Sequence, residues 1–559
     1  MSSIQVYKSN GHNYVRIIES YRVPGQKYPK VRVLKNLGRE DELEAKEPGI
    51  VEKLKREHES SRAADAAVKQ GYLIEEIKTL LQAEEKSAAE GFPLVNYGVE
   101  VYEKLWKDLK LDYFFDYRQK KDSKIQFKVK DIASLLVYSR LLNPASKKRT
   151  FENRHWLTPE DSPDRLEDIY RALPFLADQK ENLEKHLNKQ LSSRMDRDLG
   201  VAFYDVTTYY FESVRADDLK RFGYSKDNKV NQVQVVMGLL IDSNGIPISY
   251  ELFPGNTNDF KTLEPVMTKL KADYGINKVI ITADRGLNSK QNLAFLKSMG
   301  YEYVMAYKIR SSGKEIKDMV LNGETYHTVS EEFKWKVCNF STSVNYDGKK
   351  MQLDDKMVIT WSASREAKDR RDRERLIEKS KKLVESKSAL KAEMKKGGKK
   401  YVQLNFIEED QIAFNHKQLA NDELYDGYYG IQFSDETLDP SKVIDIYHGL
   451  WKIEESFRVL KSNLEARPIF VWTEESIKGH FVLCYLSLVI QRYLEYLLKK
   501  QDISLSTEVI QDAIRSAQYT LVQGENAQDK FFIKNKEHES YQDILRVLEI
   551  PAKRQYGRL

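Results

Sequence analysis

The segment that decides the fold is Val201–Val206, whose sequence is Val-Ala-Phe-Tyr-Asp-Val. Its apolar and aromatic residues predict a buried β-strand. The exception is Asp205, because an ionised carboxylate in an apolar strand is unstable unless a cation or hydrogen bonds compensate its charge. Thr207 and Thr208 continue the strand, so Asp205 lies in its interior. We therefore interpret Asp205 as a candidate functional residue.

The residues after this strand alternate between strand and helix patterns. Strands are predicted at 233–241, 246–253, 278–283 and 301–307, and helices at 260–274 and 289–299. Three strands followed by helix, strand, helix and strand is the order of an RNase-H-like core. In such a core a carboxylate midway along the first strand lies beside one at the end of the fourth, which here is Asp284. Taken alone, an aspartate at a strand end is more often a turn or cap residue.

A third acidic candidate, Glu454, belongs to a helical pattern. Tyr447, Glu454 and Lys461 recur every seven residues, so one helix face would carry all three, and Arg458 joins that face. An acidic residue among such neighbours can bind a metal while they contact phosphates. A solvated helix face with an ordinary Glu-to-Arg pair explains the same pattern. The adjacent Glu455 is a competitor, but it lies outside the seven-residue face.

Together these carboxylates suit phosphodiester chemistry with two metal ions. That chemistry requires one bridging carboxylate and further carboxylates that flank the two ions. We predict that Asp205, Asp284 and Glu454 are the catalytic residues and metal ligands.

Four stretches resemble the DDE transposases of bacterial insertion sequences, in the branch called the IS-four group. They are Tyr204–Thr208, Phe253–Asp259, Ala283–Gly286 and Tyr447–Lys461. The last is similar to the tyrosine, arginine, glutamate and lysine signature of that group, but Leu450 stands at the arginine position. This departure leaves the phosphate contact of that arginine to Lys452 or Arg458.

The resemblance implies an α/β multidomain fold, with an RNase-H-like mixed sheet flanked by helices, a largely β-stranded insertion and a helical N-terminal region. The insertion would fill the 170 residues between Asp284 and Glu454. The expected regions are a β-hairpin and charged helical arm (1–92), a helical DNA-end-binding region (93–196), the first part of the catalytic core (197–312), the insertion domain (313–440), the second part of the core (441–500) and a C-terminal region for dimerisation (501–559).

The resemblance also implies cut-and-paste transposition. Water bound to Mg²⁺ would cleave the element's ends, and the freed 3′-OH would attack target DNA; each site would hold two Mg²⁺ ions, which Mn²⁺ can replace. The expected partners are double-stranded DNA, as terminal inverted repeats and target, and a second copy in a homodimer. The predicted DNA contacts are Arg285, Trp335, Tyr447, Lys452, Arg458 and Lys461. Trp335 could stack on a flipped base in a hairpin intermediate, although a core tryptophan is the commoner explanation.

Composition limits the alternatives. The chain has 559 residues, a net charge of +6 and two cysteines, which excludes a disulfide framework and suits a reducing cytoplasm, here at the nucleoid. The most apolar stretch, Phe481–Ile490, is about half as long as a bilayer-spanning helix, so we expect no membrane contact. No phosphate-binding Gly-x-x-x-x-Gly-Lys-Ser/Thr loop occurs, which disfavours an ATP-driven enzyme. A metal-dependent nuclease without strand transfer and a catalytically silent DNA-binding protein remain alternatives.

Overall fold

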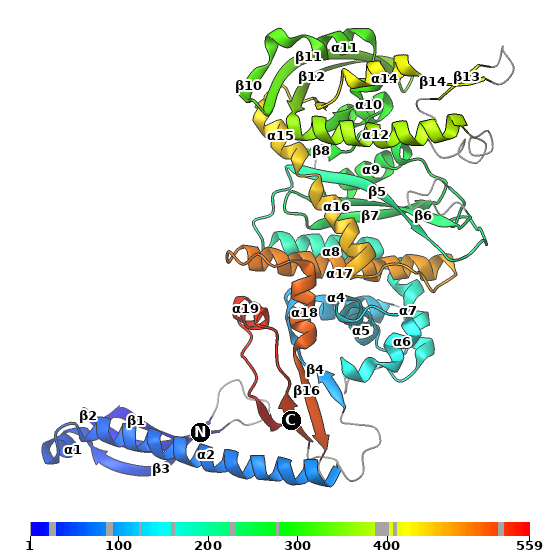
Figure 1. The fold of residues 1–559 in the computed structure, drawn as a ribbon. Helices are drawn as coiled ribbons and strands as arrows, with labels where there is room; N and C mark the ends of the chain where they lie inside the picture. The colour runs from blue at the N-terminus through cyan, green and yellow to red at the C-terminus, as the bar shows by residue number, and fades with distance from the viewer. Residues whose placement is uncertain are drawn as a thin grey trace. The chain divides into compact units, whose positions relative to one another are not determined.

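The chain forms two compact units in a computed structural model (Figure 1). One unit combines residues 1–95, 518–535 and 553–559, and the other combines residues 96–517 and 536–552. The residues expected to form one C-terminal region, 501–559, are therefore divided between the two units. The structure describes residues 2–21, 30–84, 93–121, 125–157, 163–223, 231–274, 279–385, 402–405, 411–523 and 530–559.

The first unit contains two small sheets and a long helix. The turn Asn10-Gly11, in which both residues have positive φ, joins β1 to β2 with Ser9 opposite His12. On α2, Ile77 packs with Val522 and Phe531 of the second sheet. The elements are Ser2–Ser9 (β1), His12–Tyr21 (β2), Lys30–Arg39 (β3), Glu40–Lys46 (α1), Ile50–Glu84 (α2), Leu94–Asn96 (β4), Gln518–Gln523 (β16), Lys530–Lys534 (β17) and Tyr556–Arg558 (β18).

The second unit is built on a mixed sheet in which five strands, from one edge inward, have the order β7-β6-β5-β8-β9. β5 pairs antiparallel with β6 and parallel with β8, and β8 pairs parallel with β9. This order confirms the predicted RNase-H-like α/β fold. Lys278, predicted to begin the fourth strand, lies outside the described residues. The strands are Val201–Tyr210 (β5), Gln234–Asp242 (β6), Pro247–Pro254 (β7), Ile280–Ala283 (β8) and Glu302–Tyr307 (β9).

The segment predicted to be the insertion domain, 313–440, contributes strands that extend this sheet. β15 pairs antiparallel with β9, followed in space by β12, β11 and β10. Without β15, the backbone groups on that edge of β9 would lack hydrogen-bond partners, so the added strand stabilises the core sheet. The strands are His327–Ser330 (β10), Phe333–Tyr346 (β11), Lys349–Ser362 (β12) and Tyr428–Phe433 (β15), with Val402–Asn405 (β13) and Gln411–Phe414 (β14) as a separate pair.

Helices cover both faces of the sheet. One face packs against α9 and α10, and the other against α15, α16 and α17. The helices of this unit are Glu100–Asp108 (α3), Leu111–Lys121 (α4), Val129–Leu142 (α5), Lys147–Glu152 (α6), Leu166–Asp178 (α7), Lys180–Ser192 (α8), Leu263–Tyr274 (α9), Lys290–Ser298 (α10), Lys314–Leu321 (α11), Ala363–Glu385 (α12), His416–Glu423 (α14), Pro440–His448 (α15), Trp451–Arg458 (α16), Glu474–Lys499 (α17), Thr507–Ser516 (α18) and Ser540–Val547 (α19).

α17 is the one described helix that is long and apolar enough to cross a membrane. Most of its apolar window is buried in the second unit, where it packs on α5, α7 and β7. Its apolar character is therefore accounted for by contacts inside the protein.

Candidate active site

Asp205 and Asp284 occupy neighbouring positions in the sheet. In the parallel pairing of β5 with β8, Tyr204 lies opposite Ala283, and each aspartate is the next residue along its chain. Strand spacing in a sheet is about 4.8 Å, so the hydrogen-bonded register brings the two backbones together without help from any side chain. The structure thus brings these two predicted residues side by side.

The alternation of side chains along β5 shows which face of the sheet carries Asp205. Side chains alternate along a strand, so Asp205 lies on the same face as Phe203 and Tyr209. Phe203 packs against Gly449, at the junction of α15 and α16, and Tyr209 makes an edge-on contact with Phe481 of α17 at 5.1 Å between ring centroids. Asp205 therefore faces the layer of helices that carries Glu454.

The segment that carries Glu454 is not the single helix that its spacing suggested. α15 ends at His448, α16 begins at Trp451, and a π-helical turn, Val459–Asn463, follows. The predicted helix is thus interrupted on both sides of α16, although Gly449 and Leu450 keep right-handed helical backbone angles, and the shared face of Tyr447, Glu454 and Lys461 stays a prediction. At Gly449 a Cβ atom would stand 2.4 Å from Cζ of Phe203, so the absence of a side chain there lets the segment pack closely on β5.

Glu454 and Glu455 have different surroundings. Glu455 forms ion pairs with Arg458 at 3.4 Å and with the mostly buried Arg492 of α17 at 3.7 Å. Glu454 is exposed and forms no ion pair or side-chain hydrogen bond within the described part of the chain. The environment of the two residues supports Glu454, rather than its neighbour, as the carboxylate available to a ligand.

Of the three predicted metal ligands, Asp205 and Asp284 lie side by side. Glu454 lies on a neighbouring helix but is not close enough to bind the same metal ion. α16 packs on β5 and β6. Among the described residues, however, no group of three Asp, Glu, His or Cys side chains is close enough to hold a metal ion. Carboxylate oxygens are the donors that Mg²⁺ prefers, so the donor chemistry fits, while Glu454 would have to move toward the strands to join Asp205 and Asp284.

Tyr447 lies close to Asp284. Its hydroxyl shares a hydrogen bond with that of Tyr429 on β15. Burial raises the pKa of both tyrosines, and the charge of Asp284 raises them further. The pair therefore stays protonated at neutral pH, and one of its two hydroxyl protons remains available for a ligand.

The other predicted phosphate contacts on this segment are scattered. Lys452 is half-buried, donates a hydrogen bond to the carbonyl of Ser243, and has its pKa lowered by burial. Arg458 pairs with Glu455, as described above. Lys461 lies over the ring of Tyr209, at 5.6 Å from its centroid and so toward the end of β5. These three cations do not gather beside Asp284.

Trp335 lies on β11 and is half-buried. Its ring packs on His327, with 4.9 Å between centroids, and against the apolar cluster beneath α15. Through the pairings of β11 with β12 and of β12 with β15, Trp335 stands in one row with Thr360 and Tyr429. The ring thus has packing partners, and its use in base stacking stays a prediction.

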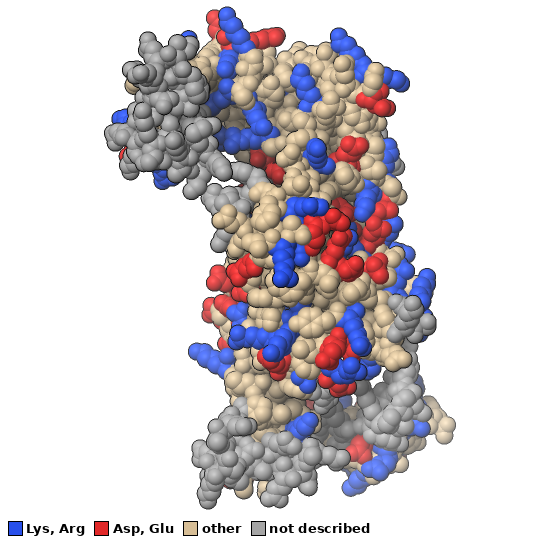
Figure 2. Space-filling model, turned by 90° about the vertical axis from the view of Figure 1, so that its right-hand side faces the viewer, with Lys and Arg blue, Asp and Glu red and all other residues tan. Residues whose placement is uncertain are grey.

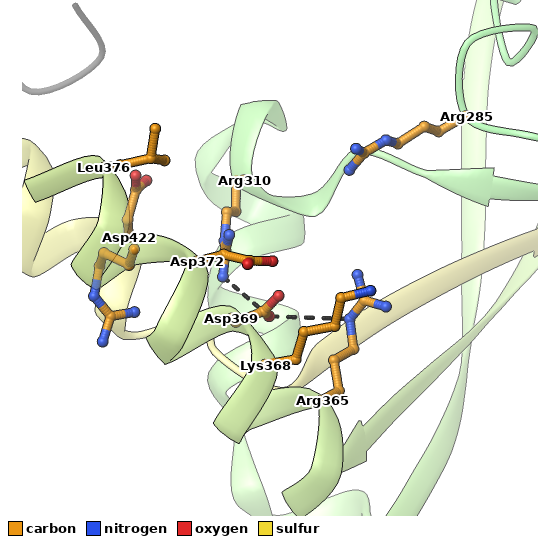
Figure 3. A pocket seen from close by; sticks show the side chains of 9 residues that line it. Arg285, Arg310, Arg365, Lys368, Asp369, Asp372, Leu376 and Asp422 are labelled. Carbon is orange, nitrogen blue, oxygen red and sulfur yellow. Dashed lines mark hydrogen bonds and ion pairs between the residues drawn. The ribbon is translucent and has the colours of Figure 1, made fainter. Parts of the chain in front are cut away.

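Sequence reasoning missed an acidic neighbour of the site and the grouping of Arg285, a predicted DNA contact, with other basic residues. Oδ2 of Asp259 lies 3.9 Å from where a Cβ on Gly286 would be, two residues from Asp284. Arg285 lines a pocket together with Arg310, Arg365 and Lys368 (Figure 3). The signal for Asp259 was present in its loop, which the family resemblance included. The basic residues are far apart in the sequence, and only the added strands bring them together.

Comparisons with known proteins agree on one family. The family described as "Transposase DDE domain" matches residues 197–490, and "IS1634 family transposase, N-terminal domain" matches residues 3–91. No curated protein matches the chain.

Among solved structures, the chain is similar to a piggyBac transposase synaptic complex with hairpin DNA, at 10% identity and a TM-score of 0.35, over 76% of this chain and 80% of that one. It is also similar to a Mos1 transposase paired-end complex, at 13% identity and a TM-score of 0.14, over 31% and 57%.

Proposed function

The chain belongs to the transposases with a DDE domain, and we propose that it performs cut-and-paste transposition of an insertion sequence, with Asp205, Asp284 and Glu454 holding the metal ions. Enzymes of this family cleave DNA and transfer strands, and they use divalent metal ions. The finer proposal is that two Mg²⁺ ions, which Mn²⁺ can replace, act at terminal inverted repeats. The observation that carries it is the register that sets Asp205 beside Asp284 on the face covered by α16.

The proposed chemistry has two displacements at phosphorus. First, a water oxygen attacks the phosphorus at the element's end, the bond to the 3′ oxygen breaks, and that oxygen leaves as a hydroxyl. Second, this 3′-OH loses its proton and attacks a phosphorus of target DNA, whose own 3′ oxygen is released. Bound metal ions lower the pKa of water and stabilise the leaving oxygen.

The chain's own groups position these reactants. Asp205 lies within β5 and Asp284 directly follows β8, so the pairing of these strands sets the two residues side by side before any ligand binds. Glu454 completes the set when α16 moves toward β5. The protonated pair of Tyr447 and Tyr429 is placed to donate a hydrogen bond to a phosphate oxygen near Asp284.

Two further parts of the proposal concern the oligomeric state and the cellular location. We infer that the protein works as a homodimer on double-stranded DNA, since two ends must be cut and joined together. We also infer that it works in the cytoplasm at the nucleoid, because its two cysteines, Cys338 and Cys484, are both free. A nuclease without strand transfer would share the carboxylates but would yield no joined product.

The test is a cleavage and joining assay with the DNA ends that flank the gene. The purified chain is incubated with labelled ends, target DNA and Mg²⁺, and the products are sized on a denaturing gel. Excised ends together with joined products support transposition. Nicks or cut ends without joined products would indicate the nuclease, and end binding without cleavage would indicate the silent DNA-binding protein.

A further inference from the structure

A basic pocket lies beside the carboxylates. One cavity of about 260 Å³ and a second of about 540 Å³ have several lining residues in common. The shared residues are Arg285, Arg310, Arg365, Asp369 and Asp422, and Lys368 lines the smaller cavity. In Figure 3, Arg285 extends from its loop toward α12, which carries Arg365 and Lys368. The face of the protein in Figure 2 carries both basic and acidic side chains. A site for an anion must therefore be sought in a local group of cations such as this one, and the net charge of the chain does not locate it.

The topology explains why the pocket lies at this edge of the sheet. β8 and β9 are parallel, and β12 runs in the same direction because both β9 and β12 are antiparallel to β15. Arg285 follows the carboxyl end of β8, Arg310 follows that of β9, and Arg365 follows that of β12. Ligands of open α/β sheets bind outside the carboxyl ends of the strands. The pocket therefore occupies the edge where Asp284 ends its strand.

The acidic residues of the pocket do not neutralise all its cations. Asp369 pairs with Arg310 at 3.2 Å and accepts a hydrogen bond from the backbone N–H of Gly427. Arg285 and Lys368 form no ion pair or hydrogen bond with any described residue. Nε of Arg365 is buried and forms no hydrogen bond with a described residue, and its ion pair with Oδ2 of Asp369 is long, at 3.9 Å. Buried donors without partners are rare, because each costs free energy, so this donor set is suited to an anion.

The pocket is continuous with the candidate active site. The guanidinium of Arg365 lies 4.2 Å from the ring centroid of Tyr429, which also lines the larger cavity. Tyr429 bonds the hydroxyl of Tyr447, and Arg285 follows Asp284 directly in the chain. An anion in the pocket would lie on the Asp284 side of the site.

We propose that Arg285, Arg365 and Lys368 hold a backbone phosphate of the DNA strand being cut, in place of the signature arginine replaced by Leu450. Leu450 is buried, and the substitutes suggested by the sequence, Lys452 and Arg458, bind other groups of the protein. The phosphate contact is thus moved from the helix with Glu454 to α12, which follows the extension of the sheet. This inference rests on the proposed function, because it places DNA at Asp284.

The test combines variants with neutral phosphates. Duplexes carrying the element's end are made with a methylphosphonate at one position at a time around the cleavage site, and the full chain is titrated with each over a salt series. The variants are Arg365→Gln, the exposed Lys368→Gln, which should fold normally, and Arg285→Gln. The matched control is Arg371→Gln on the same helix, whose side chain bonds the carbonyl of Ala367 and lines neither cavity.

We expect one or two positions at which the neutral phosphate weakens wild-type binding about tenfold and lowers the salt slope by about 0.9. At those positions Lys368→Gln and Arg365→Gln should bind natural and neutral DNA within about twofold, whereas Arg371→Gln should behave like the wild type. If the wild type binds and cuts its ends but no phosphate couples to the three residues, the pocket assignment is overturned and the proposed function stands. If the wild type neither binds nor cuts its ends, both are overturned.

Discussion

The two sides of the candidate site are held in place by different forces. On the strand side, backbone hydrogen bonds pair β5 with β8 up to Tyr204 and Ala283, the residues just before Asp205 and Asp284. On the helix side, Glu454 lies on α16, which is held by side-chain packing and by side-chain contacts, such as the hydrogen bond from Lys452 to the carbonyl of Ser243 and the ion pair between Glu455 and Arg492. Backbone register determines a position whatever the side chains, whereas packing can shift with a ligand. We propose that the strand side is preformed and that the helix side adjusts when metal and DNA bind.

The helix side nevertheless has definite anchors. Arg140 of α5 donates hydrogen bonds to the carbonyls of Leu464 and Glu465, just after the π-helical turn. Nε2 of His480 donates to the carbonyl of Ala466, and Lys147 bonds Nδ1 of the same ring. Through Arg140 and Lys147, helices α5 and α6 thus restrain the chain that follows the π-helical turn after α16.

The largest expected effect comes from the carboxylates themselves. Asp205→Ala, Asp284→Ala and Glu454→Gln should each reduce cleavage by at least about 10³-fold, because each removes a negative charge that the metal ions need. End binding, measured by mobility shift, should stay within about threefold, since phosphates are bound by other residues. Glu455→Gln is the control and should retain cleavage. A dead Glu455→Gln with an active Glu454→Gln would reverse the assignment.

The next effect is a pH dependence of the helix-side anchors. Burial lowers the pKa of Lys147 from 10.5 to about 7. Between these values the unfolded chain binds a proton that the folded chain does not, so stability rises with pH above about 7, by at most about 1.4 kcal/mol per pH unit, and is unaffected by this group below it. The contribution of Lys147 is measured as the change of the free energy of unfolding with pH, from denaturant unfolding of the wild type and of Lys147→Met at pH 7, 8 and 9. Equal slopes in the two proteins would refute it.

A smaller effect is expected at the junction of α15 and α16. Gly449→Ala places a methyl group against Phe203 and should destabilise the fold by about 1–3 kcal/mol, while moving α16 away from β5. Cleavage should fall more than end binding. Gly71→Ala is the matched control, because no atom lies within 4 Å of its added Cβ, and it should stabilise α2 by about 0.5–1 kcal/mol. An unchanged free energy of unfolding in Gly449→Ala would contradict this prediction, because it would show that Phe203 makes room for the methyl group.

The smallest effect concerns the tyrosine pair. Tyr447→Phe removes one hydroxyl and leaves Tyr429 without its partner, which should cost about 1 kcal/mol of stability and slow cleavage by about three- to tenfold. Tyr429→Phe should have a similar effect, and the double variant should be no worse than either single one, because both remove the same bond. Additive losses, measured by single-turnover cleavage, would contradict a shared role.

The strand side could be predicted from the sequence, and the helix side only in part. Apolar runs around Asp205 and before Asp284 identify strands, and their order limits the topology to an RNase-H-like sheet. The register that sets the two aspartates side by side follows from that topology. The seven-residue spacing around Glu454 was interpreted as one helix because periodicity does not reveal where a helix is interrupted, although Gly449 lies at the first interruption.

The pocket could not be predicted because it depends on long-range pairing. Arg285, Arg310 and Arg365 become neighbours only when β15 and β12 extend the sheet beyond β9. Local patterns carry no information on which distant strands pair with an edge, so the sequence predicted a β-stranded insertion but not its pairing with β9. The functional boundaries of the six expected regions stay predictions.

The central claim is that Glu454 joins Asp205 and Asp284 around shared metal ions, and localised cleavage by bound iron tests it most directly. Fe²⁺ replaces Mg²⁺ on the complex with end DNA, ascorbate and peroxide generate radicals at the ion, and the protein fragments are sized. We predict cuts near Asp205, Asp284 and Glu454 together, all suppressed by excess Mg²⁺ and by Asp205→Ala. Cuts at the two aspartates with α16 intact would show that Glu454 is not a ligand.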